Sequence, residues 1–169
     1  SGFEESARVP MIIAAPRMGV KGGVAKDPVG LIDLYPTLTE LCGVKAPGNL
    51  QGQSLVPMLK DPSAKGRGWA VTQVSRNRSQ KQGGRFFGYS LRTPRWRYTE
   101  WAQGKLGREL YDHDVDPREL KNLAEKSEYA ETVTLLSRQL RKAVSQTFPA
   151  SGKTPELQPA MWAPNLTNP

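Results

Sequence analysis

The chain has 169 residues, of which 37% are hydrophobic, and this apolar content is sufficient for a folded core. Its 24 Lys and Arg residues outnumber its 16 Asp and Glu residues, and the net charge of +8 suits either a solvated basic surface or an anionic partner. One histidine, His113, and one cysteine, Cys42, exclude a multi-histidine metal site and an intramolecular disulfide. No apolar run approaches the roughly 18 residues of a membrane-spanning helix. The first residues lack the pattern of a signal peptide, so we expect the chain to begin inside a longer protein.

A continuous apolar run at residues 9–15 (VPMIIAA) predicts a buried strand, with Pro10 at its start and Pro16 just past its end. A Gly-rich basic loop follows. A short helix is expected next, with Asp33 as its cap and Gly43 at its end. The apolar positions of this helix that we expect to be buried are Leu34, Leu38 and Leu41.

A second short helix is expected to begin with Ser54 as its cap and to carry Leu55, Met58 and Leu59. The composition then changes, because residues 63–68 are small and basic. We therefore predict a boundary there, which divides the chain into residues 1–65 and residues 66–147. Residues 148–169 contain five prolines and no periodicity, which predicts an extended tail.

Residues 69–112 predict an antiparallel meander of about four strands. Alternation indicates strands at residues 69–75, 87–91, 96–101 and 109–112. The hairpin between the second and third strands breaks at Thr93 and Pro94, because proline cannot donate to a ladder. On the third strand Trp96, Tyr98 and Glu100 share one face, while Arg95, Arg97, Thr99 and Trp101 share the other.

The meander needs a cover on its aromatic face, and the downstream sequence supplies one. Apolar residues recur at steps of three and four in the order Tyr129, Val133, Leu136, Leu140 and Val144. This spacing predicts one stripe of an amphipathic helix from about residue 128 to residue 146. We expect the helix to pack across the meander.

The search for a catalytic constellation finds little within the chain. His113 is interpreted as a turn residue, and Cys42 as a small buried hydrophobe at a helix end. Asp112, Asp114 and Asp116 alternate like the first half of a calcium loop, but Pro117 stands where that loop requires glycine. These aspartates are interpreted instead as turn residues that bind nearby backbone N–H groups.

Basic residues gather before and within the predicted hairpin. Arg76, Arg78, Lys81 and Arg85 precede it, and Arg92, Arg95 and Arg97 lie inside it. This cluster would attract sulfate, phosphate or a polyanion. An anionic substrate and nucleic acid both satisfy the observation.

Six groups of residues, in this order, resemble the C-terminal part of type I sulfatases, with the closest resemblance to the iduronate-2-sulfatase group. They are FEESARVPMIIAAP at residues 3–16, GLIDLYPTLTELCG at 30–43, GQSLVPML at 52–59, GYSLRT at 88–93, RYTEW at 97–101, and ELYD at 109–112 with DP at 116–117 and NLA at 122–124. The resemblance covers nearly all of the chain up to the Pro-rich tail.

The resemblance implies an α/β fold of the alkaline phosphatase superfamily, with an α+β C-terminal part. Residues 1–65 would be the end of the catalytic domain, including its last strand and helices, and residues 66–147 the smaller C-terminal subdomain. Sulfatases of this type use a Cys-x-Pro-x-Arg motif whose cysteine becomes formylglycine, together with a calcium ion. Cys42 does not lie in such a motif, so both groups are expected upstream of Ser1 and the isolated chain is expected to be inactive.

The resemblance also implies a substrate and a place for it. Loops of the smaller subdomain border the active site in the sulfatase fold, which makes Gln73, Arg76 and Trp101 the candidates for contact with a sulfated sugar. Arg92 is expected to hold the hairpin through carboxylate or backbone bonds. The family implies a periplasmic, secreted or lysosomal location and an upstream catalytic region as partner.

The alternative function is a stand-alone basic module that binds nucleic acid or an acidic polysaccharide. The net charge and the Arg-rich aromatic hairpin permit this function. The order of the motifs and the lack of a recognisable nucleic-acid-binding motif favour the sulfatase.

Overall fold

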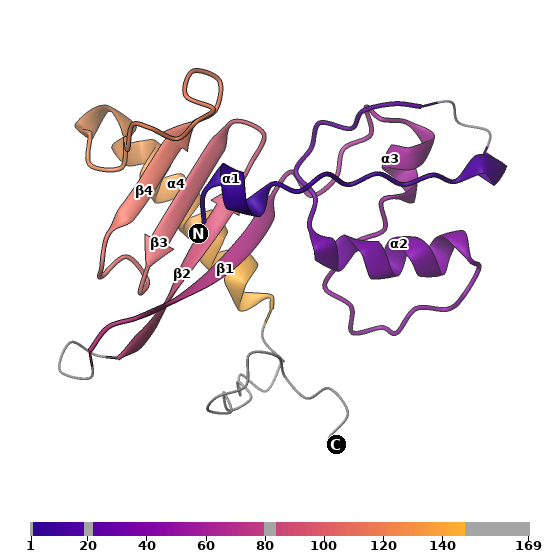
Figure 1. Cartoon of the computed structure of the whole chain (residues 1–169), viewed down its shortest axis with the longest axis horizontal. Coiled ribbons are helices and arrows are strands. Elements are labelled where there is room, and N and C mark those ends of the chain that lie inside the picture. The colour runs from indigo at the N-terminus through magenta and orange to yellow at the C-terminus, as the bar shows by residue number, and fades with distance from the viewer. Residues whose placement is uncertain (1, 19–21, 80–83, 148–169) are drawn as a thin grey trace.

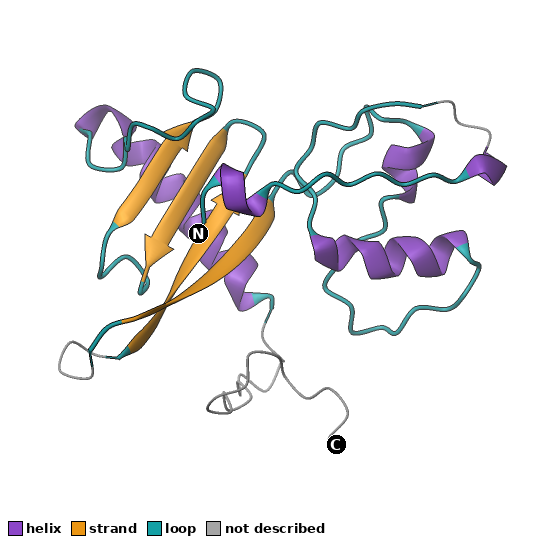
Figure 2. Cartoon of the chain, in the orientation of Figure 1, coloured by secondary structure: helices purple, strands orange, loops and turns teal. Residues whose placement is uncertain are grey.

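A computed structural model describes residues 2–18, 22–79 and 84–147 of the chain, which form two lobes (Figure 1). One lobe holds a sheet with a long helix on one face and a short helix on the other. The second lobe holds two further helices joined by long loops (Figure 2). The expected tail at residues 148–169 lies outside the described residues.

The sheet is the predicted four-stranded antiparallel meander. Its strands are β1 (Ala70–Asn77), β2 (Arg85–Arg92), β3 (Trp96–Trp101) and β4 (Arg108–Asp112), in the spatial order β1-β2-β3-β4. The backbone N–H of Thr93 donates to the carbonyl of Trp96 at 2.8 Å, which closes the turn around Pro94 as predicted. The register pairs Val71 with Leu91 and Leu91 with Tyr98, so these side chains share a face.

The long helix α4 (Ala130–Ser145) covers that face, and the 3-10 turn η4 (Ser127–Tyr129) leads into it. The core lies between helix and sheet and consists of Leu91, Tyr98, Leu110, Leu123, Leu136, Leu140 and Ala143. The predicted stripe is therefore confirmed. A buried carboxylate also joins the two layers, because Ser137 of α4 and Tyr98 both donate to Glu100 Oε1, at 2.6 Å and 2.9 Å. Burial, with the neighbouring Glu100 carboxylate, raises the pKa of Tyr98 to about 12, so its hydroxyl stays a donor at neutral pH.

The start of the chain covers the upper part of the opposite face of the sheet. There the helix α1 (Glu4–Ala7) lies against the strands (Figure 1). The ring of Phe3 lies 5.8 Å from that of Tyr111 on β4. Beside it the Arg97 guanidinium, which is 2% exposed, donates to the carbonyl of Gly2 at 2.9 Å. The first described residues thus belong to the sheet lobe.

The second lobe is built around a buried aspartate between α2 (Leu34–Leu41), α3 (Val56–Lys60) and their loops. The Asp33 carboxylate accepts hydrogen bonds from the backbone N–H groups of Gly30 and Gln53, and it forms a salt bridge with Arg67. No side chain caps α2, so the prediction that Asp33 caps this helix is wrong. Its carboxylate instead binds two loops together, because three donors surround it.

The inward side of α2 differs from the prediction. Leu38 is 53% exposed and Leu34 and Leu41 are half-buried, whereas Thr37 is buried. The reason is polar, because the Thr37 hydroxyl accepts the backbone N–H of Leu55 at 2.8 Å and donates to the carbonyl of Asp33. Thr37 faces inward because its hydroxyl satisfies the hydrogen bonds of these two backbone groups.

Residues 9–15 form no strand, contrary to the prediction. The segment is not helical, but among the described residues it has no ladder partner, and a strand requires one. Ile12 is 91% exposed, while Met11 and Ile13 line an apolar hollow with Leu55 and Met58 of the α3 region. The apolar run predicted that all of these side chains are buried, but within the described residues they are at most half-buried.

Two further sequence predictions concern the ends of elements. Cys42 is exposed at the end of α2, so its interpretation as a buried hydrophobe is wrong. α3 begins near the expected residue, but its N-cap is Leu55, so the prediction of Ser54 as the cap is wrong by one residue; the Ser54 hydroxyl still accepts the backbone N–H of Val56 at 3.2 Å. In the part of the chain that the structure describes, no helix has both the length and the apolar character needed to cross a membrane.

The proposed boundary at residues 63–68 stays a prediction. The chain returns to the sheet lobe at this point (Figure 1). Arg67 remains tied to the second lobe through Asp33, and its guanidinium carbon lies 5.1 Å from the ring centre of Trp69. One arginine thus contacts both sides of the predicted boundary.

Candidate functional site

Arg76 and Trp101 lie together on the face of the sheet opposite α4. Arg76 belongs to β1 and Trp101 ends β3, yet the guanidinium carbon lies 5.6 Å from the centre of the indole ring. The two residues are brought together because the paired strands place both side chains on the same face, with Gly88 of β2 directly opposite Trp101. The structure therefore joins two of the three sequence-predicted site residues.

A glycine provides the space for the indole. A Cβ atom at Gly88 would lie 2.4 Å from the ring of Trp101, so the ring packs directly on the glycine backbone. The indole Nε1–H donates to Glu109 Oε1 at 3.0 Å, which fixes the rotation of the ring. The ring of Phe86 meets it edge to face, with centres 6.1 Å apart. Trp101 is therefore held from three sides.

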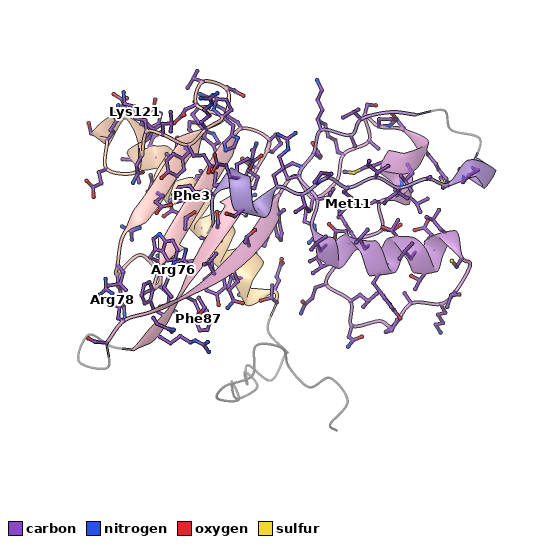
Figure 3. The ribbon with its side chains drawn as sticks, viewed as in Figure 1. Phe3, Met11, Arg76, Arg78, Phe87 and Lys121 are labelled. Carbon is purple, nitrogen blue, oxygen red and sulfur yellow. The ribbon has the colours of Figure 1, made fainter. Side chains whose placement is uncertain are left out.

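A second arginine repeats this arrangement at the neighbouring position. The guanidinium carbon of Arg78 lies 5.3 Å from the centre of the Phe86 ring. Figure 3 shows Arg76 and Arg78 in the lower part of the sheet lobe, below Phe3. Within the described residues no carboxylate forms a salt bridge with either arginine. We call Arg76, Arg78, Phe86 and Trp101 the arginine–aromatic face.

The structure places Gln73 away from this face. Gln73 pairs with Tyr89, and Tyr89 pairs with Glu100, which contacts α4. Its amide nitrogen donates to the Tyr89 hydroxyl at 3.0 Å. Residues 73 and 76 differ by an odd number, and side chains alternate along a strand, so the two point to opposite faces. The structure thus brings Arg76 and Trp101 together and places Gln73 on the other face of the sheet, and contact of any of the three with a sulfated sugar stays a prediction.

A buried cluster of charges lies farther along the same face. Arg97 forms salt bridges with Glu4 of α1 and with Glu119, and Arg92 pairs with Glu4 at 3.2 Å. The structural role predicted for Arg92 is confirmed. Burial opposes ionisation of Glu4, but the hydrogen bond from Arg97 and the charges of both arginines outweigh it and lower the pKa of the Glu4 carboxyl. We call this cluster the Arg97 latch, since it fastens α1 to the sheet.

His113 belongs to the Arg97 latch. It lies in the turn after β4, as predicted, but its side chain contacts charged groups on two sides. An arginine can only donate, so His113 Nδ1 accepts from Arg92 Nη2 at 2.9 Å. Its Nε2–H then donates to Glu119 Oε1 at 2.8 Å. Both ring nitrogens are therefore used by the neutral imidazole.

The acidic groups of the latch do not make a cation site. Ligand atoms of Glu4, His113 and Glu119 lie within 4.8 Å of one another. However, the Arg97 guanidinium already binds both carboxylates, and a metal ion beside it would meet a positive charge. The cluster fits calcium poorly and is a structural ion-pair network.

The aspartates after β4 make the predicted turn. Asp112 Oδ1 accepts the backbone N–H of Asp114 at 3.1 Å, and Asp116 accepts those of Leu120 and Lys121. Asp112 also binds Arg95 at 2.6 Å, and the hydrogen bond from Arg95 lowers the pKa of its carboxyl. Their carboxylates are therefore occupied by the backbone and by arginine.

The sequence analysis predicted neither the packing of the Trp101 ring on Gly88 nor the Arg97 latch. A glycine inside a strand is a signal of close approach, and Gly88 was such a signal. The latch had no equivalent signal, because Glu4 and Glu119 are separated by 115 positions.

Comparison with known proteins identifies the chain. Residues 2–146 match the family model described as N-sulphoglucosamine sulphohydrolase, C-terminal. The chain belongs to this family of sulfatase C-terminal regions. The resemblance to the C-terminal part of sulfatases is thereby confirmed, and the match covers both lobes.

The relatives of this sulfatase region are longer proteins. Arylsulfatase K of Rattus norvegicus is 34% identical over 86% of the chain and 26% of its own length. Delta 4,5-hexuronate-2-O-sulfatase of Bacteroides thetaiotaomicron is 37% identical over 77% of the chain and 27% of its own length. The solved structure of a 2-O GAG sulfatase superposes with a TM-score of 0.56 at 31% identity, covering 68% of this chain and 24% of its own. The chain thus spans about a quarter of the length of these relatives.

The glycine seat of Trp101 predicts the effect of one added methyl group. We expect Gly88→Ala to displace the indole, because the new Cβ would lie 2.4 Å from the ring. The Nε1–H of Trp101 would then lose Glu109, and its resonance in a ¹H–¹⁵N spectrum should shift markedly. Gly48→Ala is the control, because nothing lies within 4 Å of a Cβ at that position. An unchanged Trp101 resonance in Gly88→Ala would contradict the described seat.

Proposed function

We propose that this chain is the C-terminal segment of a sulfatase that hydrolyses sulfate esters of sulfated sugars. The observation that carries the proposal is the family match over residues 2–146, together with the shared fold. Two similar proteins have names that refer to sulfated sugars. One is the hexuronate-2-O-sulfatase described above. The other is a solved structure, 27% identical with a TM-score of 0.53, in complex with its substrate D-glucosamine-2-N,6-O-disulfate. The finer resemblance to the iduronate-2-sulfatase group belongs to this proposal.

In this proposal the chain contributes fold and one wall of the substrate pocket. The Arg76 guanidinium would bind an anionic group of the sugar through charge-assisted hydrogen bonds. Trp101 would support Arg76 from beneath and border the sugar with its edge. The exposed apolar residues of the second lobe, such as Ile12 and Leu38, would pack against the catalytic region that lies upstream.

The reaction centre would come from the upstream region. The sulfatase resemblance implies a formylglycine nucleophile and a calcium ion there. The one cysteine, Cys42, is exposed and is followed by Gly43, Val44 and Lys45, which is not the Cys-x-Pro-x-Arg motif. The compartment implied by the family, which is periplasmic, secreted or lysosomal, is part of the same proposal.

The direct test is activity in two forms of the protein. We expect no hydrolysis of an aryl sulfate or a sulfated uronic acid by the 169 residues with calcium supplied. We expect turnover once the upstream region, with its cysteine matured, is present. Turnover by the 169 residues that Cys42→Ala abolishes would overturn the proposal.

A second measurement tests the pocket. In the longer protein Arg76→Ala should raise KM for a sulfated sugar by roughly tenfold, because one charge-assisted contact is lost. Arg118→Ala is the control, since Arg118 is also exposed and lies in the turn region after β4. An unchanged KM in Arg76→Ala would remove this residue from the pocket.

The alternative, a basic module for nucleic acid, predicts a different result. Such a module would bind single-stranded or duplex DNA with an affinity that falls steeply with salt. Failure to bind DNA at moderate salt would count against the module.

A further inference from the structure

We infer that the arginine–aromatic face binds at least two successive anionic groups of a sulfated oligosaccharide, with Arg78 on Phe86 forming a second subsite beside Arg76 on Trp101. This inference rests on the proposed function and extends it, because it makes the ligand an oligomer rather than a single sugar.

The geometry supplies two equivalent arginine supports. Arg76 lies over Trp101, Arg78 lies over Phe86, and the two rings touch edge to face. The two arginines are two positions apart, which along a strand corresponds to about 6.6 Å. That spacing is comparable with the length of one sugar unit in an extended chain. Consecutive anionic sugars could therefore each meet one guanidinium.

Among the described residues these two arginines form no salt bridge, as is also true of other exposed arginines such as Arg85, whereas four arginines of the same lobe and its junction are paired. Arg67, Arg92, Arg95 and Arg97 each pair with a carboxylate, in the order Asp33, Glu4, Asp112 and Glu119. The Arg76 guanidinium donates to the carbonyl of Ser75 at 3.3 Å, and the Arg78 guanidinium packs on the Phe86 ring. Stacking on a ring holds a guanidinium in place while its N–H groups face outward. This arrangement is preorganised for anions such as sulfate or carboxylate.

The ring faces argue for a sulfated sugar over a nucleic acid. One face of the Trp101 indole packs on Gly88 and Arg76 lies over the ring, while Arg78 lies over Phe86. Single-stranded nucleic acid is usually bound by stacking its bases on free aromatic faces. These two rings instead pack against guanidinium groups. The arginine–aromatic face therefore recognises its ligand by anionic charge and not by stacking.

The test is binding of the 169-residue chain to a sulfated monosaccharide, D-glucosamine-2-N,6-O-disulfate, and to a heparin-derived disaccharide whose two sugars are both anionic, measured by calorimetry at one moderate salt concentration. We expect the disaccharide to bind roughly tenfold more tightly than the monosaccharide, because only the disaccharide reaches the second arginine. Arg78→Ala should remove this gain and leave monosaccharide binding unchanged. Arg76→Ala should weaken both ligands.

The chain offers a matched control. Arg85 lies at the same end of the sheet, but it pairs with Asn77 and points to the opposite face. Arg85→Ala removes the same charge, and its length dependence should stay as in the unaltered chain. Equal losses in Arg85→Ala and Arg78→Ala would show diffuse attraction and overturn the inference. The same outcome follows if the monosaccharide and the disaccharide bind equally, or if single-stranded DNA of matched charge binds as tightly as the disaccharide.

The two proposals can fail separately. Loss of the length dependence leaves the turnover experiment of the longer protein untouched, because that experiment uses a single sulfated sugar. Absence of turnover in the longer protein would overturn the proposed function even if the oligosaccharides bind.

Discussion

Replacing Arg97 by alanine should lower the free energy of unfolding by about 3 to 5 kcal/mol, because it takes away the buried guanidinium that the Glu4 and Glu119 carboxylates share. Arg97 is 2% exposed and binds Glu4, Glu119 and the carbonyl of Gly2. Glu119 is held in a left-handed conformation, with φ of 56°, which costs free energy in a non-glycine residue. Its side chain would lose the contact that compensates this cost.

Urea denaturation of Arg97→Ala measures this loss, and hydrogen exchange should show faster exchange at residues 4–8 as α1 leaves the sheet. Arg118→Ala provides the comparison, because Arg118 is exposed one residue before Glu119. We expect its stability to change by less than about 0.5 kcal/mol. A similar small change in Arg97→Ala would mean that the latch contributes little to the fold.

The second large effect is expected in the core under α4. Leu140→Ala should destabilise the protein by about 2 to 5 kcal/mol, since it removes a side chain that is 2% exposed and leaves a cavity against Leu91 and Tyr98. Thermal or urea unfolding measures the change.

A leucine on the other side of the same helix gives the matched control. Leu135 is 63% exposed, so Leu135→Ala removes the same atoms with little loss of burial. Its effect should stay within about 0.5 kcal/mol. If both substitutions had the same effect, the assigned inward face of α4 would be wrong.

The meander and its helix could be predicted because their signals are local. Alternation at Trp96, Tyr98 and Glu100 and the three- and four-residue steps from Tyr129 to Val144 each report burial on one side of one element. The structure confirms both patterns. Local periodicity is enough when an element packs against its neighbours in sequence.

The errors occurred where a side chain meets a distant partner. Ile12 was expected inside a sheet, but the described chain offers residues 9–15 no strand to pair with. Thr37 displaced Leu38 from the inward side because a backbone N–H at Leu55 needed an acceptor. Such contacts depend on the tertiary arrangement, which one sequence does not report.

The candidate site was predicted in part. Arg76 and Trp101 come together, whereas Gln73 was assigned to the same site without regard to strand parity. Arg78 was noted only as a member of a basic cluster, and Phe86 lay just outside the strand predicted at residues 87–91. Their pairing became visible through the register of β1 and β2, which fixes the residues that face each other. Whether Arg76 contacts substrate stays a prediction.

The Arg97 latch also bears on how the chain folds during synthesis. Glu4 is made long before its partners, since 93 residues separate it from Arg97 and 115 separate it from Glu119. The whole second lobe lies between them in sequence, so it is synthesised while α1 still lacks its sheet. Closing such a long loop carries an entropic cost that grows only slowly with length, but it delays the contact. The first residues of the chain are therefore expected to be among the last to reach their native positions, after β3 and the turn beyond β4 have emerged from the ribosome.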